Sequence, residues 1–430
     1  MARALGLDFG TTNTVIALAE GDGATQSMPF SSSAGTTDTM RTALSFMKDR
    51  QLGAQALKVE AGQAAIRAFI DNPGDCRFLQ SIKTFAASPL FQGTLIFARR
   101  HQFEDLMEIF LRRLSAYAGE AWPAEVSRIV VGRPVQFAGA SASANLALER
   151  YNTALTRLGF PEIAYVYEPV AAAHYFAQNL QKDANVLVAD FGGGTTDYSL
   201  IRFERHAGRL SATPIGHSGV GIAGDQFDAR MIEHLVAPEI GKGSQFRSFD
   251  KVLDVPSNYY TSFSRWNQLS IFKGSKEFAD LQSLVRSALE PEKLELFIDL
   301  VEHDEGYPLY QAVSATKMAL SAADEAEFSF APLGKAGRKT VRRRDFESWI
   351  ADDLSRIEAA LDQVLVETNT APAAIDKVFL TGGTSFVPAV RDIFNRRFDA
   401  GRIESGGELL SIAHGLALIG ESGEMARWAA

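Results

Sequence analysis

The 430-residue sequence contains a single cysteine, Cys76, so it cannot form an internal disulfide, which is typical of proteins in a reducing compartment. No segment approaches the roughly 18 consecutive apolar residues that suggest a membrane-spanning helix. The first residues lack the charged, apolar and small-residue regions of a secretory signal. We therefore expect a cytoplasmic protein that does not associate with membranes.

The sequence also lacks an excess of basic residues. It has 43 Lys and Arg against 52 Asp and Glu, a net charge of −9, whereas a general binder of nucleic acids needs a basic surface. Nucleic acid is therefore not an expected partner. The one dense basic run, Arg338–Arg344, is interpreted as a solvent-exposed segment, and docking of an acidic partner or a phosphate is the less favoured alternative.

Several motifs of well-known enzyme classes are absent. There is no Gly-x-x-x-x-Gly-Lys-Ser/Thr, which excludes a P-loop enzyme, and no His or Cys pair has the spacing of zinc ligands. Asp190-Phe191-Gly192 matches a protein-kinase tripeptide, but no His-Arg-Asp precedes it. Gly219–Gly224 fits the dinucleotide fingerprint, but it lies far inside the chain. We interpret it as the approach to a helix over 225–236, whose N-terminus can meet phosphate or ribose.

The sequence does contain one unusual segment twice. GLDFGTTNTVIAL begins at Gly6 and VADFGGGTTDYSL begins at Val188. In each copy an apolar run ends in Asp-Phe-Gly, a Gly/Thr cluster follows, and apolar residues resume. The pattern predicts two β-hairpins, with strands at 4–8 and 13–19 in the first and at 186–190 and 197–203 in the second.

The residue types in these turns suit a polyphosphate. Glycines let backbone N–H groups approach an anion, and threonines add hydroxyl donors. Asp8 and Asp190 supply hard oxygen atoms suited to Mg²⁺ or its coordinated waters. Either copy alone could be a tight structural hairpin, but two copies with the same chemistry favour a paired phosphate grip. The phosphate-binding candidates are Gly10, Thr11, Thr12, Asn13, Gly192, Gly193, Gly194 and Thr195.

A third glycine-rich element lies near the end of the sequence, at LTGGTSFVP (380–388). An apolar strand leads into Gly382 and Gly383, which would let a flat ligand lie against the backbone. Pro388 is expected to open a helix, as prolines in a first helical turn do. A plain strand-to-helix connection is the alternative for this element.

Five segments together resemble, in order, the motifs of the heat-shock protein 70 (DnaK-like) chaperone ATPase domain. They are DFGTT (8–12), YEPVAAA (167–173), DFGGGTTD (190–197), AGDQFD (223–228) and LTGGTSFVP (380–388). The resemblance implies a two-lobed, actin-like α/β ATPase fold, in which each lobe is a mixed sheet with flanking helices and the nucleotide lies in the interlobe cleft. It places the lobes at 1–184 and 185–430, with a lid inserted at about 231–314.

The resemblance also implies roles for individual residues. Mg²⁺ would be held through water by Asp8 and Asp190, and the cofactor would be ATP or ADP. The catalytic candidates are Lys83, Glu168, Asp190 and Thr195, and the choice of general base between Glu168 and Asp190 stays open. The adenosine candidates are Gly224, Asp225, Lys317, Met318, Gly382, Gly383 and Phe386.

Two of these positions depart from the family. Met318 and Phe386 stand where the family has arginines that hold the adenine, and Ser314 replaces a glutamate that contacts ribose. Phe386 could stack on a base and Met318 could supply a sulfur contact, while packing in the apolar core is the alternative for both. The base preference is therefore open.

The function implied is slow, Mg²⁺-dependent hydrolysis of ATP by a chaperone-like nucleotide switch. The sequence ends at Ala430 without the family's peptide-binding domain, so we expect no capture of client peptides by that route. A protein partner or co-chaperone is expected but not identified. The alternatives are a kinase of the same superfamily acting on a sugar or other small alcohol, and an actin-like ATPase that forms filaments.

Overall fold

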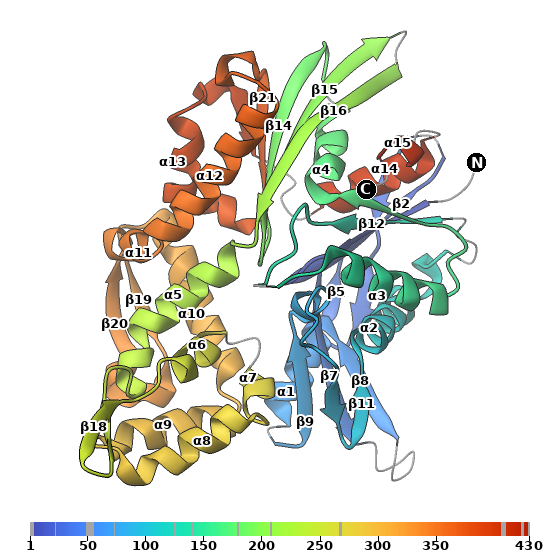
Figure 1. Cartoon of the computed structure of the whole chain (residues 1–430). Coiled ribbons are helices and arrows are strands. Elements are labelled where there is room, and N and C mark those ends of the chain that lie inside the picture. The colour runs from blue at the N-terminus through green and yellow to red at the C-terminus, as the bar shows by residue number, and fades with distance from the viewer. Residues whose placement is uncertain are drawn as a thin grey trace. The chain divides into compact units, whose positions relative to one another are not determined.

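The computed structural model describes residues 4–21, 23–48, 56–72, 74–123, 126, 128–139, 141–178, 180–206, 209–265, 269–405, 410–422 and 425–428. Contacts along the chain separate it into two compact units (Figure 1). The first unit consists of Met1–Asp71, Cys76–Gly224 and Ser355–Ala430, and the second of Asn72–Asp75 and Asp225–Leu354. Among the described residues, no helix is long and apolar enough to cross a membrane.

One mixed sheet of the first unit is built around the N-terminal hairpin. Strands β1 (Ala4–Phe9) and β2 (Asn13–Ala19) pair antiparallel, and β3 (Thr25–Ser27) extends the sheet beyond β2. On the other side of β1, strands β12 (Arg128–Arg133) and β13 (Ile163–Tyr167) are parallel to it. The short β6 (Met40–Arg41) also pairs with β2.

The other large sheet of the first unit has the same arrangement. Strands β14 (Ala184–Phe191) and β15 (Thr196–His206) form an antiparallel hairpin, and β16 (Arg209–Val220) continues it. Strands β21 (Lys377–Thr381) and β22 (Ile403–Ser405) are parallel to β14 on its other side. In Figure 1 the long green strands β15 and β16 run next to each other.

The two sheets therefore share one topology, β3-β2-β1-β12-β13 in the first and β16-β15-β14-β21-β22 in the second. The doubled segment in the sequence occupies the central hairpin of each sheet, and both predicted hairpins are confirmed. The predicted α/β class, with two mixed sheets flanked by helices, is also confirmed. Both sheets lie in one compact unit, so this division does not test the lobe boundary between residues 184 and 185 or the lid at 231–314.

Two buried helices connect these sheets. Helix α4 (Glu168–Ala177) follows β13 of the first sheet but packs against β14 and β15 of the second. Helix α14 (Ser411–Glu421) follows β22 of the second sheet but packs against β1, β2 and β12 of the first. The helices cross where Gly415 lies so close to Ala171 that a Cβ atom at 415 would be 1.8 Å from the Ala171 carbonyl oxygen.

The remaining elements of the first unit surround these sheets. A three-stranded sheet has the order β8-β7-β9, and α2 and α3 pack on each other. Helix α13 opens with Pro388 as predicted. The bounds are β4 (Phe30–Ser32), β5 (Gly35–Thr37), β7 (Ala43–Lys48), β8 (Leu57–Ala61), α1 (Gly62–Asp71), β9 (Cys76–Gln80), β10 (Thr94–Ile96), β11 (Arg99–His101), α2 (Phe103–Ala118), α3 (Ala144–Arg157), α12 (Ala351–Glu367), α13 (Pro388–Asn395) and α15 (Met425–Trp428).

The second unit is mainly helical. The helix predicted over 225–236 is α5 (Gly224–Leu235). The bounds of the other elements are β17 (Gln245–Ser248), β18 (Lys251–Asp254), α6 (Asn258–Ser264), α7 (Leu269–Phe272), α8 (Lys276–Leu284), α9 (Pro291–Glu302), α10 (Gly306–Ala322), β19 (Glu325–Ser329), β20 (Arg338–Arg342) and α11 (Arg343–Trp349).

The basic run Arg338–Arg344 lies on β20 and α11, and most of its charges have acidic neighbours. The Lys339 ammonium is 2.8 Å from a Glu239 carboxylate oxygen, and the Arg343 guanidinium is 2.8 Å from Asp324. Arg342 pairs with Glu325 at 3.1 Å. The run is thus largely neutralised within its own unit, which weakens the alternative of an acidic docking partner.

Candidate active site

The hairpin of β1 and β2 is tightly packed at its turn. A Cβ atom at residue 10 would lie 2.3 Å from the Asn13 carbonyl oxygen, so only glycine fits at Gly10. Thr11 and Thr12 complete the turn, and Asn13 begins β2. The Arg41 guanidinium donates to the Asn13 side-chain oxygen at 3.3 Å, so this predicted ligand already has a protein partner.

The second hairpin is closed by a hydrogen bond from the Gly192 N–H to the Thr195 carbonyl oxygen at 2.9 Å. Gly382, with φ of 82°, packs directly on this hairpin, because a Cβ atom there would be 2.0 Å from the Phe191 carbonyl oxygen. A side chain at 382 would therefore push β21 and the hairpin apart. Gly383, by contrast, has open space where a Cβ atom would be, which leaves its backbone accessible to a ligand.

The turns of the two hairpins lie next to each other. A Cβ atom at Gly194 would be 3.6 Å from the Thr11 hydroxyl oxygen, so the glycine-rich turn of one hairpin faces the threonines of the other. Gly193 occupies the same turn as Gly194. The structure therefore brings together the two copies of the repeated segment. Their aspartates, Asp8 and Asp190, are 182 residues apart in the sequence.

A buried ion pair lies close to these turns. The Lys83 ammonium donates to Glu168 Oε1 at 2.6 Å, and the two residues are 8% and 5% exposed. Lys83 lies in the 3₁₀ turn Ile82–Phe85, and Glu168 is the first residue of α4. Gly132 makes room for Glu168, because a Cβ atom at 132 would be 3.0 Å from its Cγ. Lys83 is therefore a buried, paired side chain and not a solvated one.

Three aspartates share the environment of this pair, and all have raised pKa values. Desolvation, followed by repulsion from Glu168, raises the pKa of Asp8 from 3.8 to about 7, against the attraction of Lys83. Burial, followed by repulsion from Glu168, Asp197 and Asp8, raises the pKa of Asp190 well above its usual value. Burial and Glu168 raise the pKa of Asp197 to about 7. The site thus contains more carboxyl groups than its one lysine could compensate if all of them were ionised.

This excess of carboxyl groups fits a divalent cation. The oxygen atoms of Asp8, Glu168 and Asp190 are the hard ligands that Mg²⁺ prefers, and a bound cation would favour their ionised forms. Within the described residues, no group of three or more His, Cys, Asp or Glu side chains is arranged to hold a metal ion directly. The binding of Mg²⁺ through water by Asp8 and Asp190 stays a prediction.

Asp197 connects the second hairpin to the segment after β12. One of its carboxylate oxygens accepts from the N–H groups of Val135 and Gln136 at 2.7 and 3.2 Å. Gly219 allows this contact, since a Cβ atom there would be 2.5 Å from the same oxygen. Asp197 therefore links the two sheets at the level of the site.

Thr42 is a site residue that the sequence interpretation missed. Its N–H donates to the Thr12 carbonyl oxygen at 2.9 Å, and its hydroxyl donates to the Gly10 carbonyl oxygen at 2.8 Å. Its own carbonyl oxygen accepts from the N–H of Ser81, which has a strained φ of 52°. Thr42 thus ties the first hairpin to the segment that carries Lys83, and no local motif marks it.

The adenosine candidates are divided between the two units. Phe386 ends the 3₁₀ turn Gly383–Phe386 of the first unit and is 51% exposed. Met318 lies on α10 of the second unit and is 70% exposed. The alternative that these two side chains fill the apolar core is therefore wrong. Lys317, also on α10, pairs with the buried Asp228 at 2.5 Å.

Gly224 and Asp225 are the first two residues of α5. Asp225 and Lys317 belong to the second unit, whereas the hairpins, Lys83, Glu168 and Phe386 belong to the first. The adenosine roles of these residues therefore stay predictions.

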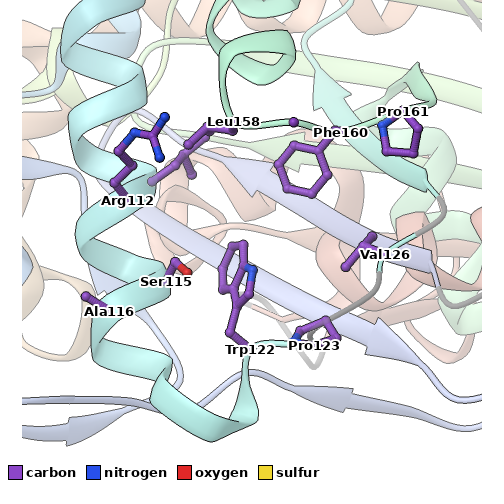
Figure 2. Close-up of a pocket in the computed structure, with 11 residues that line it drawn as sticks. Arg112, Ser115, Ala116, Trp122, Pro123, Val126, Leu158, Phe160 and Pro161 are labelled. Atoms are coloured by element: carbon purple, nitrogen blue, oxygen red, sulfur yellow. The ribbon is translucent and has the colours of Figure 1, made fainter.

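A cavity lies elsewhere in the first unit. It measures about 720 Å³ and opens between α2, the segment around Trp122 and Pro123, and the turn after α3. Figure 2 shows the rings of Trp122 and Phe160 directed toward the same space, with Arg112 at one end. None of the predicted site residues lines this cavity. Apart from Arg112, the residues that line this cavity are uncharged, so the charged cluster around Lys83 stays the candidate site.

The repeated topology of the two mixed sheets defines an α/β fold of the actin-like ATPase class. A family model described as Hsp70 protein matches residues 94–248 and 282–421, which is more than half of the sequence. The chain therefore belongs to the Hsp70 family, whose members are ATPases, and the resemblance seen in the sequence motifs is confirmed.

Proposed function

We propose that this protein binds Mg²⁺–ATP between its two phosphate hairpins and hydrolyses it to ADP and phosphate. The observation that carries the proposal is the buried Lys83–Glu168 ion pair, placed with Asp8 and Asp190 beside the facing hairpin turns. Buried acids crowded around one ammonium are costly to maintain, and such sites are typical of catalytic centres.

The hairpins would bind the phosphate chain. Backbone N–H groups of the Gly10–Thr12 turn and of the Gly192–Thr195 turn would donate to phosphate oxygens, and the hydroxyls of Thr11, Thr12 and Thr195 would add further donors. Lys83 would leave Glu168 to contact the terminal phosphate and offset the charge that develops there. Mg²⁺, held by Asp8 and Asp190 through water, would neutralise phosphate charge when bound.

Glu168 and Asp190 would orient the attacking water. Once Lys83 turns to the phosphate, the Glu168 carboxylate is released as an acceptor in a buried site. The raised pKa of Asp190 makes its ionised form a stronger base than an ordinary aspartate. In-line attack on the terminal phosphorus would then release phosphate without a covalent enzyme intermediate.

We further propose that the protein acts as a nucleotide switch. Helix α4 begins at Glu168 and packs on the second sheet, and α14 packs on the first, so both helices connect the site to the two sheets. The two lobes at 1–184 and 185–430 and the lid at 231–314 would change their arrangement with the nucleotide state and signal it to a protein partner.

Phe386→Ala should weaken ATP binding more than it slows hydrolysis. The exposed ring of Phe386 can stack on a base, and an aromatic stacking contact of this kind is worth about 1–3 kcal/mol. We expect the dissociation constant of Mg²⁺–ATP to rise about tenfold while kcat changes less than about twofold. Val366→Ala, at another exposed apolar position, is the control. If wild type and Phe386→Ala bind Mg²⁺–ATP with equal affinity, Phe386 does not contact the base.

A turnover assay tests the function itself. Purified protein with ATP and Mg²⁺, but without any added alcohol, should release inorganic phosphate. Phosphate transfer that occurs only with a sugar or another small alcohol would instead establish a kinase. Light scattering that rises with ATP and protein concentration would support the actin-like alternative.

A further inference from the structure

A cluster of aromatic side chains lies directly beneath the first phosphate hairpin. Tyr151, on α3, packs edge-on against Phe9 with ring centroids 5.9 Å apart and stacks on Phe103 at 5.7 Å. Phe9 is the residue that follows Asp8, so the Tyr151 ring supports the end of β1 from below. Tyr151 also lies near Tyr165 of β13, with ring centroids 6.5 Å apart.

The hydroxyl of Tyr151 is buried and has no hydrogen-bond partner among the described residues. The side chain is fully buried, so water cannot satisfy the group from outside. A buried hydroxyl without a partner is costly, and native proteins keep one where it has a use. Tyr165 offers a close comparison, because its hydroxyl is also buried without a partner within the same described residues.

The two tyrosines differ in their charged surroundings. Arg150, the residue before Tyr151, donates to the Phe85 carbonyl oxygen at 2.8 Å, which holds α3 against the 3₁₀ turn that carries Lys83. Burial raises the pKa of Tyr151 most, Lys83 opposes this rise, and Glu168, Tyr165 and Asp8 add to it. Burial alone raises the pKa of Tyr165. Tyr151 therefore stays a neutral phenol that can both accept and donate a hydrogen bond beside the ion pair.

We propose that Tyr151 is a positioning residue for Lys83. The ammonium of Lys83 has three N–H donors, and one is bonded to Glu168 Oε1. When Lys83 leaves Glu168 for the terminal phosphate, the Tyr151 oxygen accepts a second N–H and holds the ammonium in line. The phenolic O–H then donates a hydrogen bond to the Glu168 carboxylate that Lys83 has released. This inference rests on the proposed ATP hydrolysis and adds no covalent step to it.

The test compares Tyr151→Phe with Tyr165→Phe. Each variant removes one oxygen atom from a buried hydroxyl that has no partner in the described residues, so both should fold, with a Tm equal to or above that of the wild type. In Tyr151→Phe we expect kcat for phosphate release to fall about tenfold, because the variant loses one charge-assisted hydrogen bond. KM for ATP and the calorimetric affinity for Mg²⁺–ATP should stay within about twofold of the wild-type values. Tyr165→Phe should match the wild type in all of these.

Each outcome separates the two proposals. If the wild type releases phosphate and Tyr151→Phe has the same kcat, Tyr151 has no positioning role and the ATPase proposal stands. Equal losses in both tyrosine variants, or a fall in affinity without a fall in kcat, would show a general packing effect and overturn the inference. If the wild type binds Mg²⁺–ATP but releases no phosphate, the proposed function fails, and the role of Tyr151 fails with it.

Discussion

Lys83→Ala should reduce phosphate release from Mg²⁺–ATP by about 100- to 1,000-fold or more, the usual cost of losing a group that stabilises transition-state charge. It should also lower the free energy of unfolding by about 3 kcal/mol, because Glu168 would be left as a buried charge without its partner. Phosphate release in a coupled assay and chemical denaturation measure the two effects.

The double variant Lys83→Ala/Glu168→Gln separates these effects. It removes the uncompensated charge, so most of the lost stability should return while turnover stays absent. Asp190→Asn provides a second comparison, since it relieves repulsion in the cluster and should keep the fold while abolishing phosphate release. Wild-type turnover in Lys83→Ala or Asp190→Asn would mean that the active site lies elsewhere.

Asp8→Asn should stabilise the protein free of ligand at pH 8 and weaken its binding of Mg²⁺–ATP at least tenfold. The folded protein holds the pKa of Asp8 near 7, compared with 3.8 for an ordinary aspartate. Between these pH values the folded state binds more protons than the unfolded state, so stability falls as pH rises from about 4 to about 7 and then levels off. Removing the carboxylate should recover on the order of 2 kcal/mol at pH 8.

The same carboxyl predicts the pH dependence of binding. Mg²⁺ requires ionised carboxylates, so the affinity for Mg²⁺–ATP should weaken as pH falls through 7, and binding near pH 6.5 should release protons. Calorimetry in two buffers of different ionisation enthalpy measures that release. The variant Asp250→Asn, at an exposed position of the second unit, is the control. A pH-independent affinity, or a destabilised Asp8→Asn, would contradict the electrostatic account of the site.

The two hairpins could be predicted from the sequence because their signals are local. In each copy the two apolar runs predict the strands, and the Gly/Thr cluster between them predicts the turn. The whole pattern spans only about 14 residues. The predicted strand over 13–19 matches β2, and the others differ only at their ends. The shared strand order of the two sheets follows from the same repeat, with parallel strands added on one side of each hairpin.

The contacts that make the site could not be predicted from local patterns. Lys83 and Glu168 are 85 residues apart in the sequence, so no local pattern shows that they form an ion pair. Thr42 and Tyr151 carry no motif, and their roles depend on packing against residues from other strands and helices. The raised pKa values arise only when the acids meet in one buried volume, because desolvation and mutual repulsion are properties of the folded state.

Titration calorimetry of the purified protein with ATP in the presence and absence of Mg²⁺, at two temperatures, tests the central claim most directly. We expect saturable binding of one nucleotide per chain that requires Mg²⁺ and is weakened by Asp8→Asn. The second temperature ensures that binding with a small enthalpy is not overlooked. Absence of saturable heat at both temperatures, or identical binding by wild type and Asp8→Asn, would contradict a magnesium–nucleotide site between the hairpins.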